Sequence, residues 1–236
     1  MTVTSEERAR YDLCDMLALL LAATLATTSP SIAGDYFQGD GLGVNWTLTL
    51  DTDHTFLFKW RGCLGQYASA YGKWTEHDGI LQLTITNQSG SANAMPLTYR
   101  IFRWDERIYL VDNPAKFAEW VNRGWEPRSE EHGLVFLRSP DWNRPVDGIP
   151  ALPPEFAKLI LQRPVRARII EAQGHRGTID VGSKDGVMSG LLLTLHDGCS
   201  FDNVRVVHTS QKTAIVEGKR DLPKNGHLSS LEGDKW

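Results

Sequence analysis

The feature that most constrains this chain is an alternation of apolar and polar residues with a period of two, which begins at Val44. Residues 44–50 read VNWTLTL. Successive side chains of a β-strand point to opposite faces of a sheet, so this alternation is typical of a strand with one buried face. Similar runs recur around 54–60, 68–75, 80–86, 97–104, 107–111 and 133–138. With a short strand at 35–37, the sequence predicts about eight strands in an antiparallel, lipocalin-like meander or barrel.

One short helix is expected to interrupt these strands after residue 112. Asn113 is suited to cap its start, Pro114 to occupy its first position and Gly124 to end it. Phe117 and Val121 lie four residues apart, so they share the face that we expect to be buried.

A cluster of prolines divides the chain. Six of its 11 prolines lie between residues 140 and 164, and proline removes a donor from a β ladder. The last part of the chain has about six short strand-like runs and few aromatic residues, which favours a small SH3/OB-like β-barrel. The predicted fold class is therefore all-β. The predicted parts are an N-terminal helix or signal peptide at 1–33, an aromatic-rich β-barrel or curled sheet at 34–140, a Pro-rich linker at 141–163 with a short helix at 154–161, and the small barrel at 164–236.

The first 33 residues fit two interpretations. Residues 16–28 are uncharged and apolar, and the small residues up to Ala33 fit the cleavage site of a secretory signal. Against export, Asp15 directly precedes the apolar run, where a signal has positive charge, and Thr4 and Glu7 fit a helix capping box. Charge therefore favours a docked amphipathic helix and a cytoplasmic location over export with a signal cleaved after Ala33.

Aromatic side chains are concentrated in the predicted first barrel, because 17 of the 22 lie between residues 34 and 140. A barrel of about eight strands is just wide enough to be filled by side chains or to hold one small ligand. A packed aromatic core and an apolar ligand pocket are therefore both open. The candidate ligand-binding residues are Trp46, Phe58, Trp60, Trp74, Tyr99 and Trp104.

The sequence carries no complete catalytic or metal-binding motif, so we predict no catalytic residue, no metal site and no cofactor. The seven histidines show none of the spacings of zinc sites, and no Gly-x-Ser-x-Gly motif occurs. Cys63 is the best candidate nucleophile, with Arg61 close by and His54 on the same predicted strand as a base. A buried, inert cysteine is the commoner case. A disulfide between Cys63 and Cys199 is also open.

Composition and local motifs exclude other classes of protein. A net charge of −4 gives no basic field for nucleic acid. No apolar run reaches the ~18 residues of a membrane-spanning helix. The His-Asp-Gly segments at 77–79 and 196–198 fit hairpin turns. The glycine-rich segment 39–43 fits a tight bend, because no Lys-Ser/Thr pair follows it as in a phosphate-binding loop.

Two stretches resemble known families. Residues 34–45 and 60–65 carry the signature GxYxxGDGLGxN…WxGCLG, which resembles a bacterial protein family without an assigned activity, so it implies no site residue. Residues 179–190, which include Gly182, Asp185 and Gly190, are similar to a turn in the β domain of MreC-like envelope scaffold proteins. That resemblance implies a small barrel, and it is the basis for expecting an association with the bacterial envelope.

These observations favour a non-enzymatic binding or interaction protein, because no catalytic constellation is complete. The expected partner is a protein or a small apolar ligand. The alternative is a lipocalin-like carrier of a small apolar ligand, and the second alternative is a thiol-dependent enzyme that uses Cys63. Neither nucleic acid nor a transmembrane segment is expected.

Overall fold

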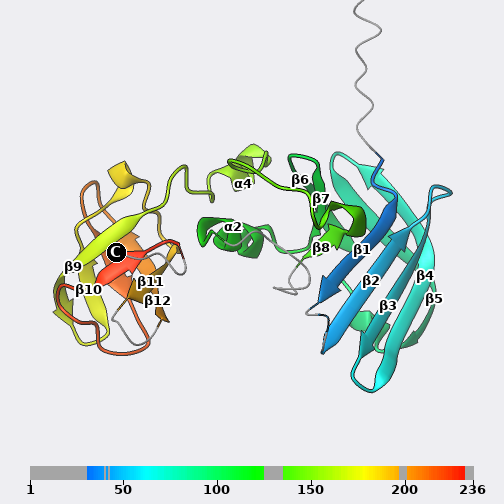
Figure 1. Ribbon diagram of the computed structural model, residues 1–236, viewed down its shortest axis with the longest axis horizontal. Helices are drawn as coiled ribbons and strands as arrows, with labels where there is room; N and C mark the ends of the chain where they lie inside the picture. The colour runs from blue at the N-terminus through cyan, green and yellow to red at the C-terminus, as the bar shows by residue number, and fades with distance from the viewer. Residues whose placement is uncertain (1–30, 40, 42, 125–134, 197–200, 232–236) are drawn as a thin grey trace, which may run out of the picture. The chain divides into compact units, whose positions relative to one another are not determined.

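The computed structural model describes residues 31–39, 41, 43–124, 135–196 and 201–231. The chain divides into two compact units, residues 1–32 and 33–236. The predicted N-terminal helix or signal peptide therefore lies almost wholly outside the described residues. The described part of the second unit contains two closed antiparallel barrels and short helices (Figure 1). The prediction of an all-β fold with two barrels is confirmed.

The first barrel has eight strands that pair in chain order and close where β8 pairs with β1. Strand β2 has the predicted bounds, and its alternation is visible in Leu48 and Leu50, which are buried, and Thr47, which is exposed. The strands are β1 (Gly34–Gly39), β2 (Val44–Leu50), β3 (Thr55–Gly62), β4 (Gly65–His77), β5 (Ile80–Gly90), β6 (Thr98–Trp104), β7 (Arg107–Val111) and β8 (Phe136–Arg138).

Turns with left-handed backbone join several of these strands. Asp78 and Gly79, between β4 and β5, have φ angles of 50° and 70°, as a type I′ hairpin requires. The His-Asp-Gly segment at 77–79 is thus a turn, whereas 197–198 of the second such segment lie outside the described residues. At Gly39 an added Cβ would lie 2.5 Å from the carbonyl oxygen of Val44, so the bend after β1 requires a residue without a side chain.

The predicted helix is α2 (Pro114–Asn122). The side chain of Asn113 accepts a hydrogen bond from the backbone N–H of Lys116 at 3.2 Å, and Gly124 follows the helix with a φ of 72°. Phe117 and Val121 pack against the outer face of β6, β7 and β8. The capping signals in the sequence therefore placed this helix correctly.

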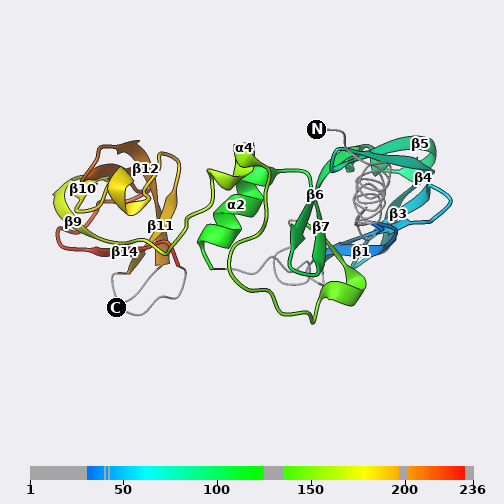
Figure 2. The same cartoon turned by 90° about the horizontal axis from the view of Figure 1, so that it is seen from above.

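Part of the proline-rich segment, residues 142–156, also packs on this outer face. Its apolar side chains join the hydrophobic cluster formed by α2 and the sheet. Helix α4 (Pro154–Ala157) is shorter than the predicted helix at 154–161 and lies against α2 (Figure 2). The residues that pack on the cluster are Trp142, Val146, Leu152 and Phe156.

Buried polar side chains fix the start of this segment. The guanidinium of Arg107, which is 1% exposed, donates hydrogen bonds to the carbonyl oxygens of Arg144 at 2.6 Å and Trp142 at 3.1 Å. The carboxylate of Asp141 is fully buried and accepts from Nε of Arg138 at 2.9 Å. Charged groups are rarely buried unless they are paired, so these contacts tie the backbone at 138–144 to β7 and β8.

The second barrel closes in the strand order β10-β13-β12-β11-β14-β9. In the turn at 182–186, Gly186 has a positive φ of 88°, whereas Gly182 has an extended φ of −143°. Gly182 is required for another reason, because an added Cβ would collide with the carbonyl oxygen of Ser210. The strands are β9 (Arg166–Gln173), β10 (Arg176–Ile179), β11 (Leu192–His196), β12 (Phe201–Thr209), β13 (Ala214–Glu217) and β14 (His227–Ser229).

The second barrel has its own aliphatic core. Its cluster of buried residues consists of alanine, valine, leucine and isoleucine, and includes Ile169, Leu195 and Val204. It shares no residue with the cluster under α2. The domain boundaries at 34, 140 and 164 stay a prediction. Among the described residues, no helix is long and apolar enough to cross a membrane.

Candidate ligand-binding site

Four of the six predicted ligand-binding residues meet in the first barrel. Trp46 on β2 makes edge contacts with Phe58 and Trp60 on β3, with ring centroids 5.6 and 6.0 Å apart. Phe136 on β8 lies 6.4 Å from the Trp46 ring and 5.7 Å from that of Tyr99 on β6. We call these five side chains the aromatic cluster.

The register of the strands explains why these rings meet. Trp46 and Trp60 lie directly opposite each other in the β2–β3 ladder, and Phe58 shares a face with Trp60 because side chains two residues apart point the same way. Phe136 joins them because β8 closes the barrel by pairing with β7 and β1. Sequence reasoning missed Phe136, since alternation alone does not reveal which distant strand closes a barrel.

Three polar groups of the cluster are buried and have no hydrogen-bond partner within the part of the chain that the structure describes. They are Nε1 of Trp46, Nε1 of Trp60 and the hydroxyl of Tyr99. Leaving a buried polar group unpaired costs about 1–3 kcal/mol, and most such groups in folded proteins are paired. Each of the three groups could donate a hydrogen bond to an acceptor atom of another molecule.

The Tyr99 hydroxyl is a hydrogen-bond donor at neutral pH. Tyr99 is 2% exposed. Burial raises the pKa of its hydroxyl well above the ordinary value, and the negative charge of Asp112 raises it further. A protonated phenol can donate, as the indole N–H of each tryptophan must.

The structure does not bring Trp74 and Trp104 into the cluster. The Trp74 ring packs on His54 with centroids 4.4 Å apart, and its Nε1 donates to the carbonyl oxygen of Asp51 at 3.0 Å. Trp104 belongs to the cluster under α2, and its Nε1 donates to the carbonyl oxygen of Asp147 at 2.9 Å. Both indole N–H groups therefore already have an acceptor.

The aromatic cluster leads to the end of the barrel where β2 begins and β3 ends. Trp60 contacts Tyr67 with ring centroids 5.5 Å apart, and Tyr67 is 37% exposed. Leu64, at the tip of the β3–β4 hairpin, is 91% exposed, and Val44 at the start of β2 is 48% exposed. A Cβ on Gly62 would collide with the Tyr67 ring, so the hairpin lies close to that ring. Three exposed apolar side chains therefore lie at this end of the barrel, on β2, on the β3–β4 hairpin and on β4.

Cys63 lies in the same hairpin and is exposed, so the expectation of a buried cysteine is wrong. The structure also separates it from its predicted base. His54 precedes β3 and Cys63 follows it, so the eight residues of β3 lie between them, roughly 26 Å of strand. His54 itself is in a turn, with a φ of 65°. Cys199 lies outside the described residues, so a disulfide with Cys63 stays a prediction.

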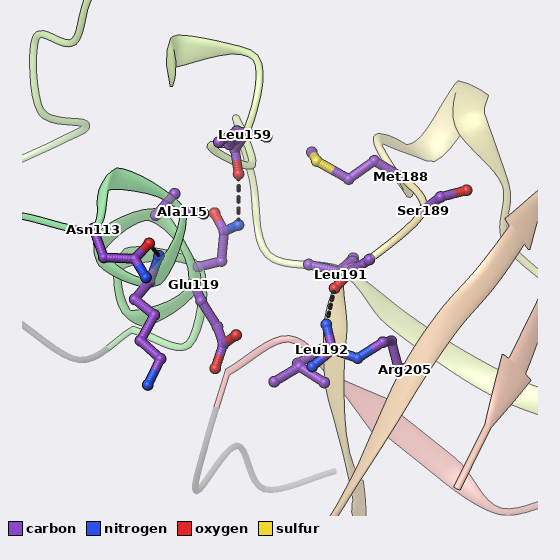
Figure 3. A pocket seen from close by; sticks show the side chains of 13 residues that line it. Asn113, Ala115, Glu119, Leu159, Met188, Ser189, Leu191, Leu192 and Arg205 are labelled. Carbon is purple, nitrogen blue, oxygen red and sulfur yellow. Dashed lines mark hydrogen bonds between the residues drawn. The ribbon is translucent and has the colours of Figure 1, made fainter. Parts of the chain in front are cut away.

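A separate pocket of about 320 Å³ opens beside α2 (Figure 3). Two of its polar side chains already have partners in the protein. Asn122 donates to the carbonyl oxygen of Leu159 at 2.8 Å, and Arg205 donates to that of Gly190 at 2.9 Å. The sequence did not predict this pocket. Lys116 and Ser189 in its lining are exposed to water, whereas the three unpaired donors of the aromatic cluster are buried. Over the described ranges, no group of three or more His, Cys, Asp or Glu side chains is arranged to hold a metal ion.

No family model matches this chain, and no curated protein matches it. Among solved structures, the chain is similar to the crystal structure of the Cpx pathway activator NlpE from Escherichia coli. The identity is 12% and the TM-score 0.24, over 84% of this chain and 95% of that chain. A likeness this distant transfers no activity and no site residue to this chain.

Proposed function

We propose that this chain is a non-enzymatic binding protein whose first barrel takes a small, largely apolar ligand that carries hydrogen-bond acceptors. The observation that supports this function is the aromatic cluster with its three unused donors. Aromatic rings supply apolar contact area, and a few placed polar groups orient a ligand. Because all three groups of the cluster can donate, the polar end of the ligand has to accept, as a carboxylate or carbonyl does.

The alternative of a thiol-dependent enzyme has less support. A nucleophilic thiol needs a base within hydrogen-bond reach, and the length of β3 separates Cys63 from His54. The envelope association rests on the resemblance of residues 179–190 to MreC-like scaffold proteins. Fractionation of cells that express the full chain tests it, because recovery of the protein only in the soluble cytosolic fraction would contradict this location.

Calorimetric titration of the full chain with straight-chain carboxylates of eight to sixteen carbons tests the ligand site. The matched n-alkanes are the apolar comparison, since they lack an acceptor. We expect saturable binding of at least one carboxylate and weaker binding of its alkane. The absence of saturable heat with every member of the series would contradict the proposed ligand class.

Phe substitutions locate the site, because phenylalanine keeps an aromatic ring and removes the donor. We expect Trp46→Phe and Trp60→Phe each to weaken carboxylate binding about tenfold, the usual effect of one hydrogen bond to a charged group. Trp74→Phe is the control, because its indole N–H already bonds to Asp51. Equal losses in Trp74→Phe and Trp60→Phe would place the ligand elsewhere.

A further inference from the structure

The second half of β5 has no neighbouring strand on one of its edges. β5 pairs with β4 over residues 80–90. Its pairing with β6 covers only residues 80–82, followed by one hydrogen bond from the N–H of Leu83 to the carbonyl oxygen of Leu97. Within the described ranges, the backbone of residues 84–90 therefore has no strand partner on that side.

This edge is accessible. Six of its seven residues are exposed, and only Ile85 is half-buried. The side-chain contacts of this segment do not replace a strand. The hydroxyl of Thr86 donates to the carbonyl oxygen of Tyr71, Gln88 donates to the side chain of Asn93, and the hydroxyls of Ser89 and Ser69 share a hydrogen bond. An exposed, unpaired row of N–H and C=O groups is a template on which another strand can pair.

The edge also lacks two of the usual protections against such pairing, charge and proline. Natural sheets protect their edges with charged residues, proline or a covering element. No Asp, Glu, Lys or Arg occurs from Ile80 to Tyr99, although charged residues make up 23% of the sequence. The proline in this stretch, Pro96, follows the edge and does not interrupt it.

The composition of the edge fits a second copy of this chain. In an antiparallel pairing about a two-fold axis, residues 84–90 of one copy meet residues 84–90 of the other. Like charges placed opposite each other would destabilise such a pair, and this segment carries none. Its Thr, Asn, Gln and Ser side chains can hydrogen-bond across the pair. Tyr71, which lies opposite Asn87 in the β4–β5 ladder and is 47% exposed, adds apolar surface beside it.

We propose that two copies of this chain associate by antiparallel pairing of their β5 edges over residues 84–90. The pairing would satisfy the backbone groups of both edges. An interface built on one seven-residue edge is small, so the association is weak and depends on protein concentration. It does not depend on the ligand site.

Sedimentation equilibrium of the full chain over a range of concentrations tests the pairing. We expect the average mass to rise from 26.4 kDa toward twice that value. Asn87→Glu adds a negative charge to each strand of the pair, so we expect it to raise the dissociation constant at least tenfold. Thr47→Glu is the matched control, since it adds the same charge to an exposed position on β2, which pairs on both sides at that position.

Hydrogen exchange provides a second measurement that needs no variant. We expect the amides of residues 84–90 to exchange more slowly at high concentration, while those of β2 stay unchanged. An average mass of 26.4 kDa at every concentration would overturn the proposal. It would instead favour an extended segment of another protein as the partner of this edge. An unchanged association of Asn87→Glu, or the absence of concentration-dependent protection, would overturn it as well.

Discussion

The two barrels of this chain are stabilised by different kinds of side chain. The buried cluster of the second barrel contains only aliphatic residues, such as Leu195 and Val216. The first barrel contains rings that carry polar groups, such as Trp46 and Tyr99, and the half-buried Arg138 on β8 pairs with the buried Asp141 that follows it. Aliphatic side chains have no polar atom to satisfy, whereas Trp and Tyr bring an N–H or O–H that needs a partner. The aromatic residues of the first barrel therefore bring hydrogen-bonding groups into its interior, whereas the aliphatic cluster of the second barrel brings none.

The largest expected effect is a loss of stability in the second barrel alone. Leu195 is fully buried in its core, so Leu195→Ala should lower the free energy of unfolding by about 3 kcal/mol through lost burial and a cavity. Seven of the eight tryptophans precede residue 164, so tryptophan fluorescence reports mainly on the first barrel. In urea titrations, part of the circular dichroism transition should shift to lower urea while the fluorescence transition stays in place.

Ile215 on β13, which is 37% exposed, provides the control for this variant. Ile215→Ala should cost less than about 1 kcal/mol, because the site is already partly hydrated. A fluorescence transition that moved with the circular dichroism transition in Leu195→Ala would show that the barrels unfold as one unit, and the comparison would fail.

A smaller effect, of opposite sign, is expected in the first barrel. Tyr99→Phe removes a buried hydroxyl without a partner, so it should raise the free energy of unfolding by about 1 kcal/mol. Tyr109→Phe is the matched control, since the Tyr109 hydroxyl is also buried but accepts a hydrogen bond from Arg107 at 3.4 Å. That variant should lose about 1 kcal/mol. Equal losses in both variants by thermal and urea unfolding would contradict the unpaired state of Tyr99.

The buried Tyr99 hydroxyl should also make the stability of the folded protein depend on pH in the alkaline range. Burial raises the pKa of Tyr99 in the folded protein, whereas a tyrosine in the unfolded chain ionises near pH 10. The contribution of this group to stability is therefore fully present below about pH 10 and is lost as the pH rises further. Tyr99→Phe should lose less stability than the unmodified chain between neutral pH and pH 11.

The smallest effect concerns a turn of the first barrel whose polar groups are satisfied. Asp53 accepts hydrogen bonds from the hydroxyl of Thr55 at 2.6 Å and from its backbone N–H at 2.9 Å, and these bonds lower the pKa of the carboxyl. Thr55→Val removes the first bond, so the pKa should rise toward its ordinary value. In the unmodified chain, the contribution of the Asp53 carboxylate to stability is present above the unfolded-state pKa and is lost as the pH falls through the folded-state pKa.

A carboxyl-detected NMR titration measures this change. Thr49→Val is the control, because the Thr49 hydroxyl donates to Asp35 instead and should leave the pKa of Asp53 unchanged. An unchanged Asp53 pKa in Thr55→Val would show that the backbone bond alone sets it, and that the threonine hydroxyl does not contribute.

Local signals predicted the fold well, because strands, turns and helix caps depend on neighbouring residues. The strand at 44–50, the turn at 78–79 and the cap at Asn113 all lie where the sequence places them. The site depends on pairing over long distances, and there the sequence was less informative. One error was avoidable from local pattern alone. Tyr99 and Trp104 are five residues apart on β6, so the period of two places their side chains on opposite faces of the strand. Both were nevertheless predicted to line the same pocket.

Other features could not be derived from local patterns. The ladder of β5 with β6 stops at Gln82, and no local signal states how far two strands pair. The prolines of the linker indicated irregular backbone, but the docking of Trp142 and Phe156 depends on a complementary surface made by α2 and the sheet.

The anchoring of residues 138–156 also defines the smallest fragment that retains a complete first barrel. A truncation after residue 140 would leave Phe102 and Trp104 without the side chains of Trp142 and Phe156 that pack in the same cluster, and it would remove the buried carboxylate of Asp141. Such a fragment would present an apolar strip to water and aggregate. A fragment that extends past α4 keeps this strip covered.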